Sequence, residues 1–221
     1  MQSYRYIIGD KMKINYIHIS ELFGEPLCED RIKSTALSLG EYPALSARVS
    51  CALAKGNKQR RAESLAGLYL LSRCAEIPEC ARLICEDGGK PYFENSDVFF
   101  NISHSNGFTV CASGDSCLGI DVEKLRPIPD RDRLATRYFC KEEKDYIEGS
   151  ADRDTSFWRI WTRKEAYIKY LGMGLAQSLC SFNTLDPKLH FSEITVDDNG
   201  ARYLISVCSS ACQNIDMRKE K

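Results

Sequence analysis

The sequence predicts an α+β fold, from two kinds of periodic segment and from their order along the chain. Residues 13–19 alternate polar and apolar side chains as a half-buried strand does, and residues 58–75 carry apolar side chains on one helical face. A longer helix is expected over residues 154–171, where Gly172 and Gly174 supply stop signals. Both halves contain helical and hairpin-like segments without a regular strand–helix alternation, which favours α+β over a doubly wound sheet.

The other elements are expected from short apolar runs between turn residues. They are helices near residues 29–38, 133–139 and 141–147, and strands at 98–102, 108–112, 118–122, 189–196 and 202–207. A hairpin is expected over residues 81–93, around Asp87-Gly88-Gly89. Met12 stands directly before the first strand, so residues 1–11 are expected to be an extension. The polar tail after Cys212 is expected to be frayed.

Composition and charge are those of an ordinary globular protein. The 221 residues are 43% hydrophobic and 28% charged, with a formal net charge of -1. No global excess of charge indicates a nucleic-acid or membrane partner, and no apolar run reaches the ~18 residues of a membrane span. The amino terminus lacks an apolar secretory segment, so a cytoplasmic enzyme is expected.

Eleven cysteines are many for this length, but their spacing argues against a metal cage. No pair has the C-x2-C spacing, and only three histidines are available as further ligands. The odd count, and cysteines within apolar stretches such as 83–85 and 110–112, favour reduced, buried thiols.

Two carboxylates lie two residues apart in Gly119-Ile120-Asp121-Val122-Glu123. On a strand, Asp121 and Glu123 point to the same face. Carboxylates ~5 Å apart repel by roughly 3 kcal/mol at an effective dielectric constant of about 20, so a hard divalent cation is a natural counter-charge. Taken alone, the pattern is more typical of an exposed strand edge with solvated acids.

The expected long helix carries Trp161, Glu165 and Lys169 in one row. Glu165 offers a third carboxylate, and Lys169 a cation one turn further. An ordinary Glu-to-Lys pair, worth only ~0.2–0.5 kcal/mol, would also explain this spacing. Together with Asp121 and Glu123, however, the row supplies acids for a metal and lysine for a phosphate, as phosphoryl chemistry requires.

Two further segments could bind a ligand. Ser103 and His104 end an apolar strand, and ligand binding is favoured over Ser–His catalysis because sequence neighbours rarely have triad geometry. Lys90 lies in Gly88-Gly89-Lys90-Pro91, which alone is typical of an exposed turn. Residues 48–73 contain six basic side chains and the single acid Glu63. This local excess of positive charge could bind a small polyanion or an acidic partner, or it could simply form a solvated helix face.

These segments together resemble the 4'-phosphopantetheinyl transferases, specifically the larger Sfp-like (surfactin-synthetase-activating) type. The matching stretches are Gly89-Lys90-Pro91, Phe100-Asn101-Ile102-Ser103-His104-Ser105, Gly119-Ile120-Asp121-Val122-Glu123, Arg137-Tyr138-Phe139 with Glu143, and Trp161-Thr162-Arg163-Lys164-Glu165-Ala166-Tyr167-Ile168-Lys169. The resemblance implies transfer of the 4'-phosphopantetheine group from coenzyme A to a serine of an apo acyl or peptidyl carrier protein, with release of adenosine 3',5'-bisphosphate. It also implies two similar α+β halves in a pseudo-dimeric monomer, here residues 12–104 and 105–221, with coenzyme A between them.

Carried over by position, the resemblance assigns the acids and lysines. Asp121, Glu123 and Glu165 would hold Mg2+, with Mn2+ left open, against the coenzyme A pyrophosphate. Glu165, or a water on the metal, would take the proton of the carrier serine. Lys169 and Lys164 would offset charge on the transferring phosphate.

The same resemblance assigns Lys90, Ser103 and His104 to the coenzyme A nucleotide, with His104 at the 3'-phosphate. The chain departs from the family pattern at residues 63–67, where Glu63 stands in place of the usual arginine. The candidates for the 3'-phosphate are therefore spread over Ser64 in that segment, Arg60 or Arg61 one turn earlier, and Arg48. A catalytically silent module that binds coenzyme A or a carrier protein, and a metal-dependent phosphodiesterase, are the alternatives.

Overall fold

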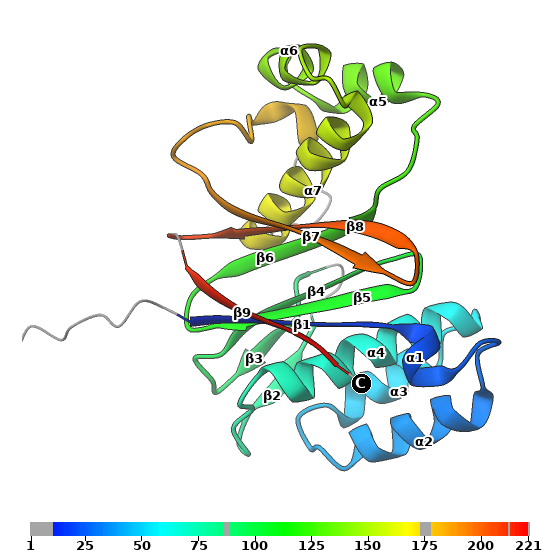
Figure 1. Cartoon of the computed structure of the whole chain (residues 1–221). Helices are drawn as coiled ribbons and strands as arrows, with labels where there is room; N and C mark the ends of the chain where they lie inside the picture. Colours follow the sequence, from blue (N-terminus) through cyan, green and yellow to red (C-terminus); the bar gives the residue numbers. More distant parts are fainter. Residues whose placement is uncertain (1–10, 86–88, 173–177, 212, 221) are drawn as a thin grey trace, which may run out of the picture.

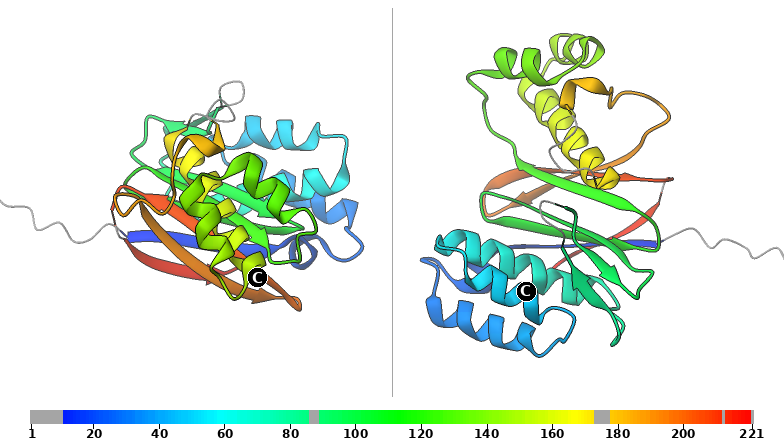
Figure 2. Two further views of the ribbon diagram at one scale, coloured as in Figure 1. Left: turned by 90° about the horizontal axis from the view of Figure 1, so that it is seen from above. Right: turned by 180° about the vertical axis from the view of Figure 1, so that it is seen from behind.

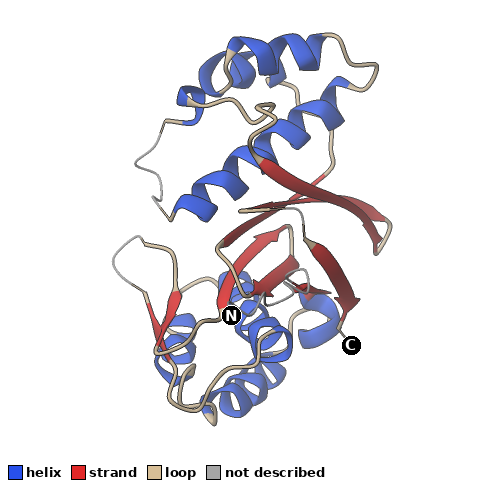
Figure 3. Cartoon of the chain, turned by 90° about the vertical axis from the view of Figure 1, so that its left-hand side faces the viewer, coloured by secondary structure: helices blue, strands red, loops and turns tan. Residues whose placement is uncertain are grey.

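Two β-sheets pack face to face, and each carries helices on its outer face (Figures 1 and 3). The computed structural model describes residues 11–85, 89–172, 178–211 and 213–220. The four-stranded sheet has the order β4 (Phe99–Ser105), β5 (Phe108–Gly114), β1 (Lys11–His18), β9 (Asn214–Lys219). The three-stranded sheet has the order β6 (Leu118–Lys124), β8 (Ala201–Ser209), β7 (His190–Asp198). Apolar side chains of both sheets, among them Phe108, Ile120 and Ile205, form one buried cluster between them.

Helices of the first half cover the outer face of the four-stranded sheet. They are α1 (Ile19–Phe23), α2 (Glu29–Gly40), α3 (Ser46–Leu53) and α4 (Lys58–Cys74), with the hairpin β2 (Arg82–Ile84) and β3 (Tyr92–Glu94) beside them. The Asn57 side chain caps the start of α4 by accepting a hydrogen bond from the Arg60 backbone N–H. The apolar face of α4, including Leu65 and Ala66, is fully buried against the sheet and the neighbouring helices.

The second half places one long helix on the outer face of the three-stranded sheet. This helix, α7 (Arg153–Leu171), follows α5 (Arg131–Tyr138) and α6 (Lys141–Glu148), and a short 3-10 helix covers Leu179–Ser181. Asp152 accepts a hydrogen bond from the Thr155 N–H at the start of α7, and Gly172, with φ of 70°, ends it in the left-handed conformation. The view from behind in Figure 2 (right) shows α7 running obliquely from α5 and α6 down to the strands of this sheet.

Gly119 lets α7 approach β6 at backbone distance. A Cβ atom at this position would lie 2.1 Å from the Ala166 carbonyl oxygen and 2.3 Å from the Tyr170 backbone nitrogen. Atoms cannot come that close, so only glycine fits here. On the helix the contact involves the residues directly after Glu165 and Lys169, and on the strand it lies two residues before Asp121. It therefore fixes how closely these side chains meet.

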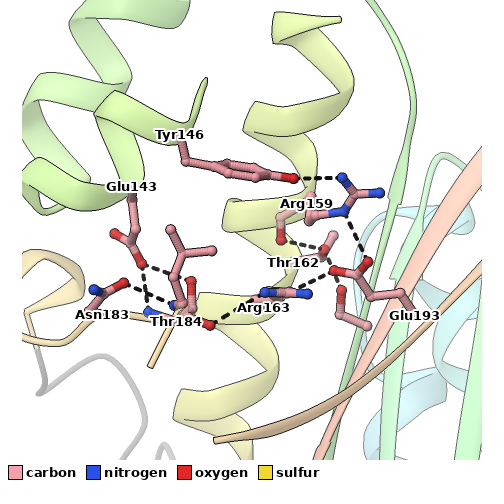
Figure 4. Close-up of polar contacts among 10 residues, drawn as sticks. Glu143, Tyr146, Arg159, Thr162, Arg163, Asn183, Thr184 and Glu193 are labelled. Carbon is pink, nitrogen blue, oxygen red and sulfur yellow. Dashed lines mark hydrogen bonds and ion pairs between the residues drawn. The ribbon is translucent and has the colours of Figure 1, made fainter. Parts of the chain in front are cut away.

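Ion pairs fix α7 over β7 as well (Figure 4). Glu193 of β7 accepts hydrogen bonds from Arg159 Nε at 2.9 Å and from Arg163 Nε at 2.6 Å. Arg159 also donates to the Tyr146 hydroxyl of α6 at 2.7 Å. These side chains are only partly exposed, so the pairs are less screened by solvent than surface pairs. They join α6, α7 and the sheet into one unit.

A buried ion pair ties α6 to the middle of α7. Lys164 Nζ lies 2.7 Å from Glu143 Oε2, and the two side chains are 1% and 0% exposed. The ammonium also donates to the carbonyl oxygens of Leu179 and Phe182, and the other Glu143 oxygen accepts from the Thr184 N–H and hydroxyl. Burial lowers the pKa of Lys164, although Glu143 opposes that shift.

The structure confirms the predicted α+β class and the positions of most predicted elements. The prediction of a frayed tail is wrong, because residues 214–219 form β9, which pairs in parallel with β1. Ile215 and Met217 of β9 pack against the core. The expected boundary at residues 104/105 falls at the end of β4, and the first sheet combines β4 and β5 with β1 and β9 from the two ends of the described chain. The expected extension, apart from Lys11, and the hairpin turn at 86–88 lie outside the described residues.

Cysteine burial follows the prediction only in part. Cys74, Cys111 and Cys208 are buried, but Cys85, in one of the apolar stretches cited for burial, is exposed because it follows the end of the short strand β2. Within the described ranges, no helix is both long and apolar enough to cross a membrane.

Gly119→Ala should destabilise the protein by at least about 2 kcal/mol, because β6 and α7 would have to separate to admit the methyl group. Urea denaturation of both proteins measures the change. Gly40→Ala is the matched control, since its Cβ would meet nothing within 4 Å. Equal stability of the two variants would contradict the close approach.

Lys164→Met should cost roughly 3–5 kcal/mol of unfolding free energy, because Glu143 would remain as an uncompensated buried charge. Adding Glu143→Gln removes that charge and should recover part of the loss. Chemical denaturation measures both, and a double variant no more stable than Lys164→Met alone would contradict the pairing of the two buried charges.

Candidate active site

Strand β4 presents two different faces, as the alternation of side chains along a strand requires. On the face toward β6, Asn101 accepts a hydrogen bond from the Ile120 N–H at 2.9 Å, and Ser105 donates to Glu123 Oε2 at 2.6 Å. On the face toward α4, Phe100, Ile102 and His104 line a pocket. The two faces belong to one edge strand, so the pocket and the acids of β6 are neighbours.

A lysine, a serine and an aspartate meet where β4, β6 and α7 come together. Asp121 is 6% exposed, and its Oδ1 accepts from Lys169 Nζ at 2.6 Å and from Ser103 Oγ at 2.8 Å. Lys169 Nζ also donates to Ser103 Oγ at 3.0 Å and to the Ile120 carbonyl oxygen at 3.1 Å. Three residues that are far apart in sequence are thus held in direct contact.

The carboxylates around this contact are short of positive charge. Asp121 Oδ2 is buried with no hydrogen-bond partner, and the Glu165 carboxylate has no polar partner among the described residues. Burial raises the pKa of both Glu123 and Glu165, and the negative charge of Asp121 raises both further. Across the described ranges, no three His, Cys, Asp or Glu side chains are already arranged as metal ligands. The acids therefore offer oxygen donors and excess negative charge without a preformed cage.

The α4-side pocket has a volume of about 230 Å³ and combines apolar walls with charged groups. Arg48, Lys55, Glu63, Ser64 and His104 supply its polar lining, and Leu68, Leu83, Pro91, Phe100 and Ile102 are among its apolar residues. Lys55 donates to Ser64 Oγ at 2.6 Å. This pocket brings together three of the predicted nucleotide-binding residues, Arg48, Ser64 and His104. It adds Lys55, which in the sequence was only one member of a basic segment.

Glu63 and His104 face each other in this pocket. Glu63 Oε2 lies 3.5 Å from His104 Nδ1, and Glu63 Oε1 accepts from Gln59 Nε2 at 2.9 Å. Burial lowers the pKa of His104, and Glu63 works against that shift. The imidazole is therefore held by an acid at the position where the resemblance implies a phosphate contact.

Other predicted site residues lie elsewhere. Lys90 is partly buried and donates to the Leu118 carbonyl oxygen at the start of β6, and burial lowers its pKa. Arg61 pairs with Glu29 at 3.1 Å, and Arg60 is exposed; neither lines the pocket. Lys164 is paired with Glu143 instead of Asp121, so its role at the transferring phosphate stays a prediction. Its row on the helix differs from that of Glu165 and Lys169 because residues one position apart point about 100° apart.

Comparison with known proteins gives a consistent result. A family profile described as the 4'-phosphopantetheinyl transferase superfamily matches residues 117–214. The 4'-phosphopantetheinyl transferase AcpT of Salmonella typhimurium is 34% identical over 171 residues, which are 75% of this chain and 84% of that protein. The transferase Sfp of Bacillus subtilis is 38% identical over 105 residues, 46% of each chain.

A solved structure, the holo-[acyl-carrier-protein] synthase of Thermotoga maritima, matches with a TM-score of 0.33 and 21% identity over 43% of this chain and 64% of its own. The relatives of the AcpT and Sfp types are about equally similar to this chain. Both the family profile and the AcpT relative cover the acids of β6 and α7. The chain belongs to the 4'-phosphopantetheinyl transferases, which move the phosphopantetheine group of coenzyme A to carrier proteins.

Proposed function

We propose that phosphopantetheine transfer takes place at the contact of Ser103, Asp121, Glu165 and Lys169, and that it depends on Mg2+. The observation that carries this proposal is the unpartnered buried oxygen of Asp121 beside two further acids whose pKa values burial raises. A buried carboxylate oxygen without a partner is costly, and a cation would satisfy it.

Asp121, Glu123 and Glu165 are the residues that would hold the ion. Their donors are all carboxylate oxygens, which suit a hard divalent cation, Mg2+ or Mn2+. When bound, such an ion supplies positive charge to the phosphate oxygens during displacement. The side chains must shift to bind it, since Lys169 and Ser105 now bond Asp121 and Glu123.

The residues of the chain perform the proton and charge steps. Glu165 takes the proton of the carrier serine, a role favoured by its raised pKa, because a base is most effective when its pKa is close to the operating pH. The serine oxygen then bonds to the phosphorus that carries pantetheine, and the bond from that phosphorus to the leaving nucleotide phosphate breaks. Lys169 Nζ offsets the negative charge of these phosphates.

The pocket between α3, α4 and β4 is proposed to hold the adenosine end of coenzyme A. Its apolar walls suit a base, and Arg48, Lys55 and Ser64 suit phosphate oxygens. His104 follows Ser103 directly, so the pocket lies beside the transfer site. Because one chain supplies both sheets and the site between them, we also propose that the enzyme acts as a monomer.

Glu165→Gln should lower the turnover number by roughly 100-fold or more while leaving the fold intact, because the variant keeps its shape but loses the base and a metal ligand. The assay incubates apo carrier protein with enzyme and coenzyme A over a range of Mg2+ concentrations. Mass spectrometry then follows the gain of one phosphopantetheine group on the carrier. Glu148→Gln, an exposed glutamate of α6, is the control. Near-normal turnover of Glu165→Gln, or full activity in excess chelator, would refute the assignment.

Arg48→Ala should raise the KM for coenzyme A by about tenfold or more with a smaller effect on kcat, as expected for loss of a charged hydrogen bond to phosphate. Arg60→Ala, an exposed arginine outside the pocket, should leave KM unchanged. Steady-state kinetics at varied coenzyme A concentration gives KM and kcat for both variants. Equal effects would show that the pocket does not bind the nucleotide.

A further inference from the structure

Glu63 places a negative charge inside the pocket proposed for the nucleotide. The side chain is 6% exposed, lines the pocket and sits opposite His104. A buried carboxylate is retained only where polar partners satisfy it, and here Gln59 and His104 do so. The acid is thus built into the pocket wall, so whatever enters the pocket meets it.

The position of Glu63 relative to the transfer site defines which part of the co-substrate it faces. His104 directly follows Ser103, which contacts Lys169, and it lines the pocket together with Lys55, so the imidazole lies beside both the transfer site and the basic side of the pocket. In coenzyme A a single ribose separates the pyrophosphate from the 3'-phosphate. If the pyrophosphate lies at Lys169, as the proposed function holds, the 3' position lies in the part of the pocket that His104 and Glu63 line.

A carboxylate at this position interacts differently with a 3'-phosphate and with a 3'-hydroxyl group. It repels a phosphate dianion, whereas it accepts a hydrogen bond from a hydroxyl group. The same physics operates in dinucleotide-binding proteins, where an acid binds a ribose hydroxyl and an arginine accommodates a ribose phosphate. Arg48 and Lys55 still attract a phosphate here, so Glu63 reduces the preference for it instead of excluding it.

We propose that Glu63 determines selectivity at the ribose 3' position, so that the enzyme uses 3'-dephospho-coenzyme A as well as coenzyme A. The proposal rests on the assignment of the nucleotide to this pocket. The chemistry is otherwise the same: the carrier serine oxygen bonds to the pantetheine phosphorus, its proton goes to Glu165, and the broken phosphoanhydride bond releases adenosine 5'-phosphate in place of the 3',5'-bisphosphate.

The test measures kcat/KM for both co-substrates with one apo carrier protein, for the unmodified enzyme and for Glu63→Gln. The unmodified enzyme should prefer coenzyme A by less than about tenfold, and Glu63→Gln should increase that preference by about tenfold or more, mainly by lowering the KM for coenzyme A. Glutamine keeps the shape and an acceptor for Gln59. Glu76→Gln, whose side chain is 94% exposed and outside this pocket, should change neither constant.

A second measurement does not depend on turnover. Calorimetric titration should show that Glu63→Gln strengthens binding of adenosine 3',5'-bisphosphate relative to adenosine 5'-phosphate, and a thermal melt confirms that the variant is folded. An unchanged preference in folded Glu63→Gln, or more than a hundredfold preference for coenzyme A in the unmodified enzyme, would overturn the inference. If Arg48→Ala also leaves the KM for coenzyme A unchanged, the pocket assignment itself fails; if only the Glu63 result is negative, that assignment stands.

Discussion

The close approach of α7 to β6 at Gly119 is the constraint on which the site depends. Backbone atoms of Ala166 and Tyr170 lie where a side chain at position 119 would be. With the helix this near the strand, Lys169 reaches Asp121 directly and Glu165 comes within electrostatic reach of both acids of β6. A wider separation would leave the same residues as solvated charges on two separate elements. The outer contacts of α7, with Glu193 and Glu143, hold the helix in this position.

Strand β4 joins the two parts of the proposed site. Its side chains alternate, so Ser103 contacts Asp121 and His104 lines the pocket. In the proposed arrangement, one short strand therefore contacts both the pyrophosphate and the adenosine part of the co-substrate. Because β4 is the edge strand of its sheet, a molecule can cross from one face to the other without passing through the core. The core between the sheets stays apolar, and the charged groups gather along this edge.

Charge is balanced differently at the two lysines of α7. Lys164 is enclosed with Glu143 and two carbonyl oxygens, so its charge is fully used within the protein. Lys169 shares one oxygen of Asp121 with Ser103, and the other oxygen of that carboxylate is buried with no hydrogen-bond partner. A charge that the fold leaves incompletely compensated is available to a ligand, and one that is fully paired in the core is not. This difference supports the proposed role of Lys169 at the phosphates and shows that Lys164, five positions earlier, is held by the fold.

The sequence by itself determined the α+β class, most strands and helices, and the family, because periodicity and turn residues are local and the motifs occur in a fixed order. It also placed Asp121, Glu123, Glu165 and Lys169 on the correct elements. It could not show that residues 214–219 complete the first sheet, since pairing with β1 requires a partner about 200 residues away. Nor could it separate Lys164 from Lys169, or Arg48 and Lys55 from Arg60 and Arg61. Those distinctions depend on which face of a helix is buried and against what, and only the packing of distant segments decides that.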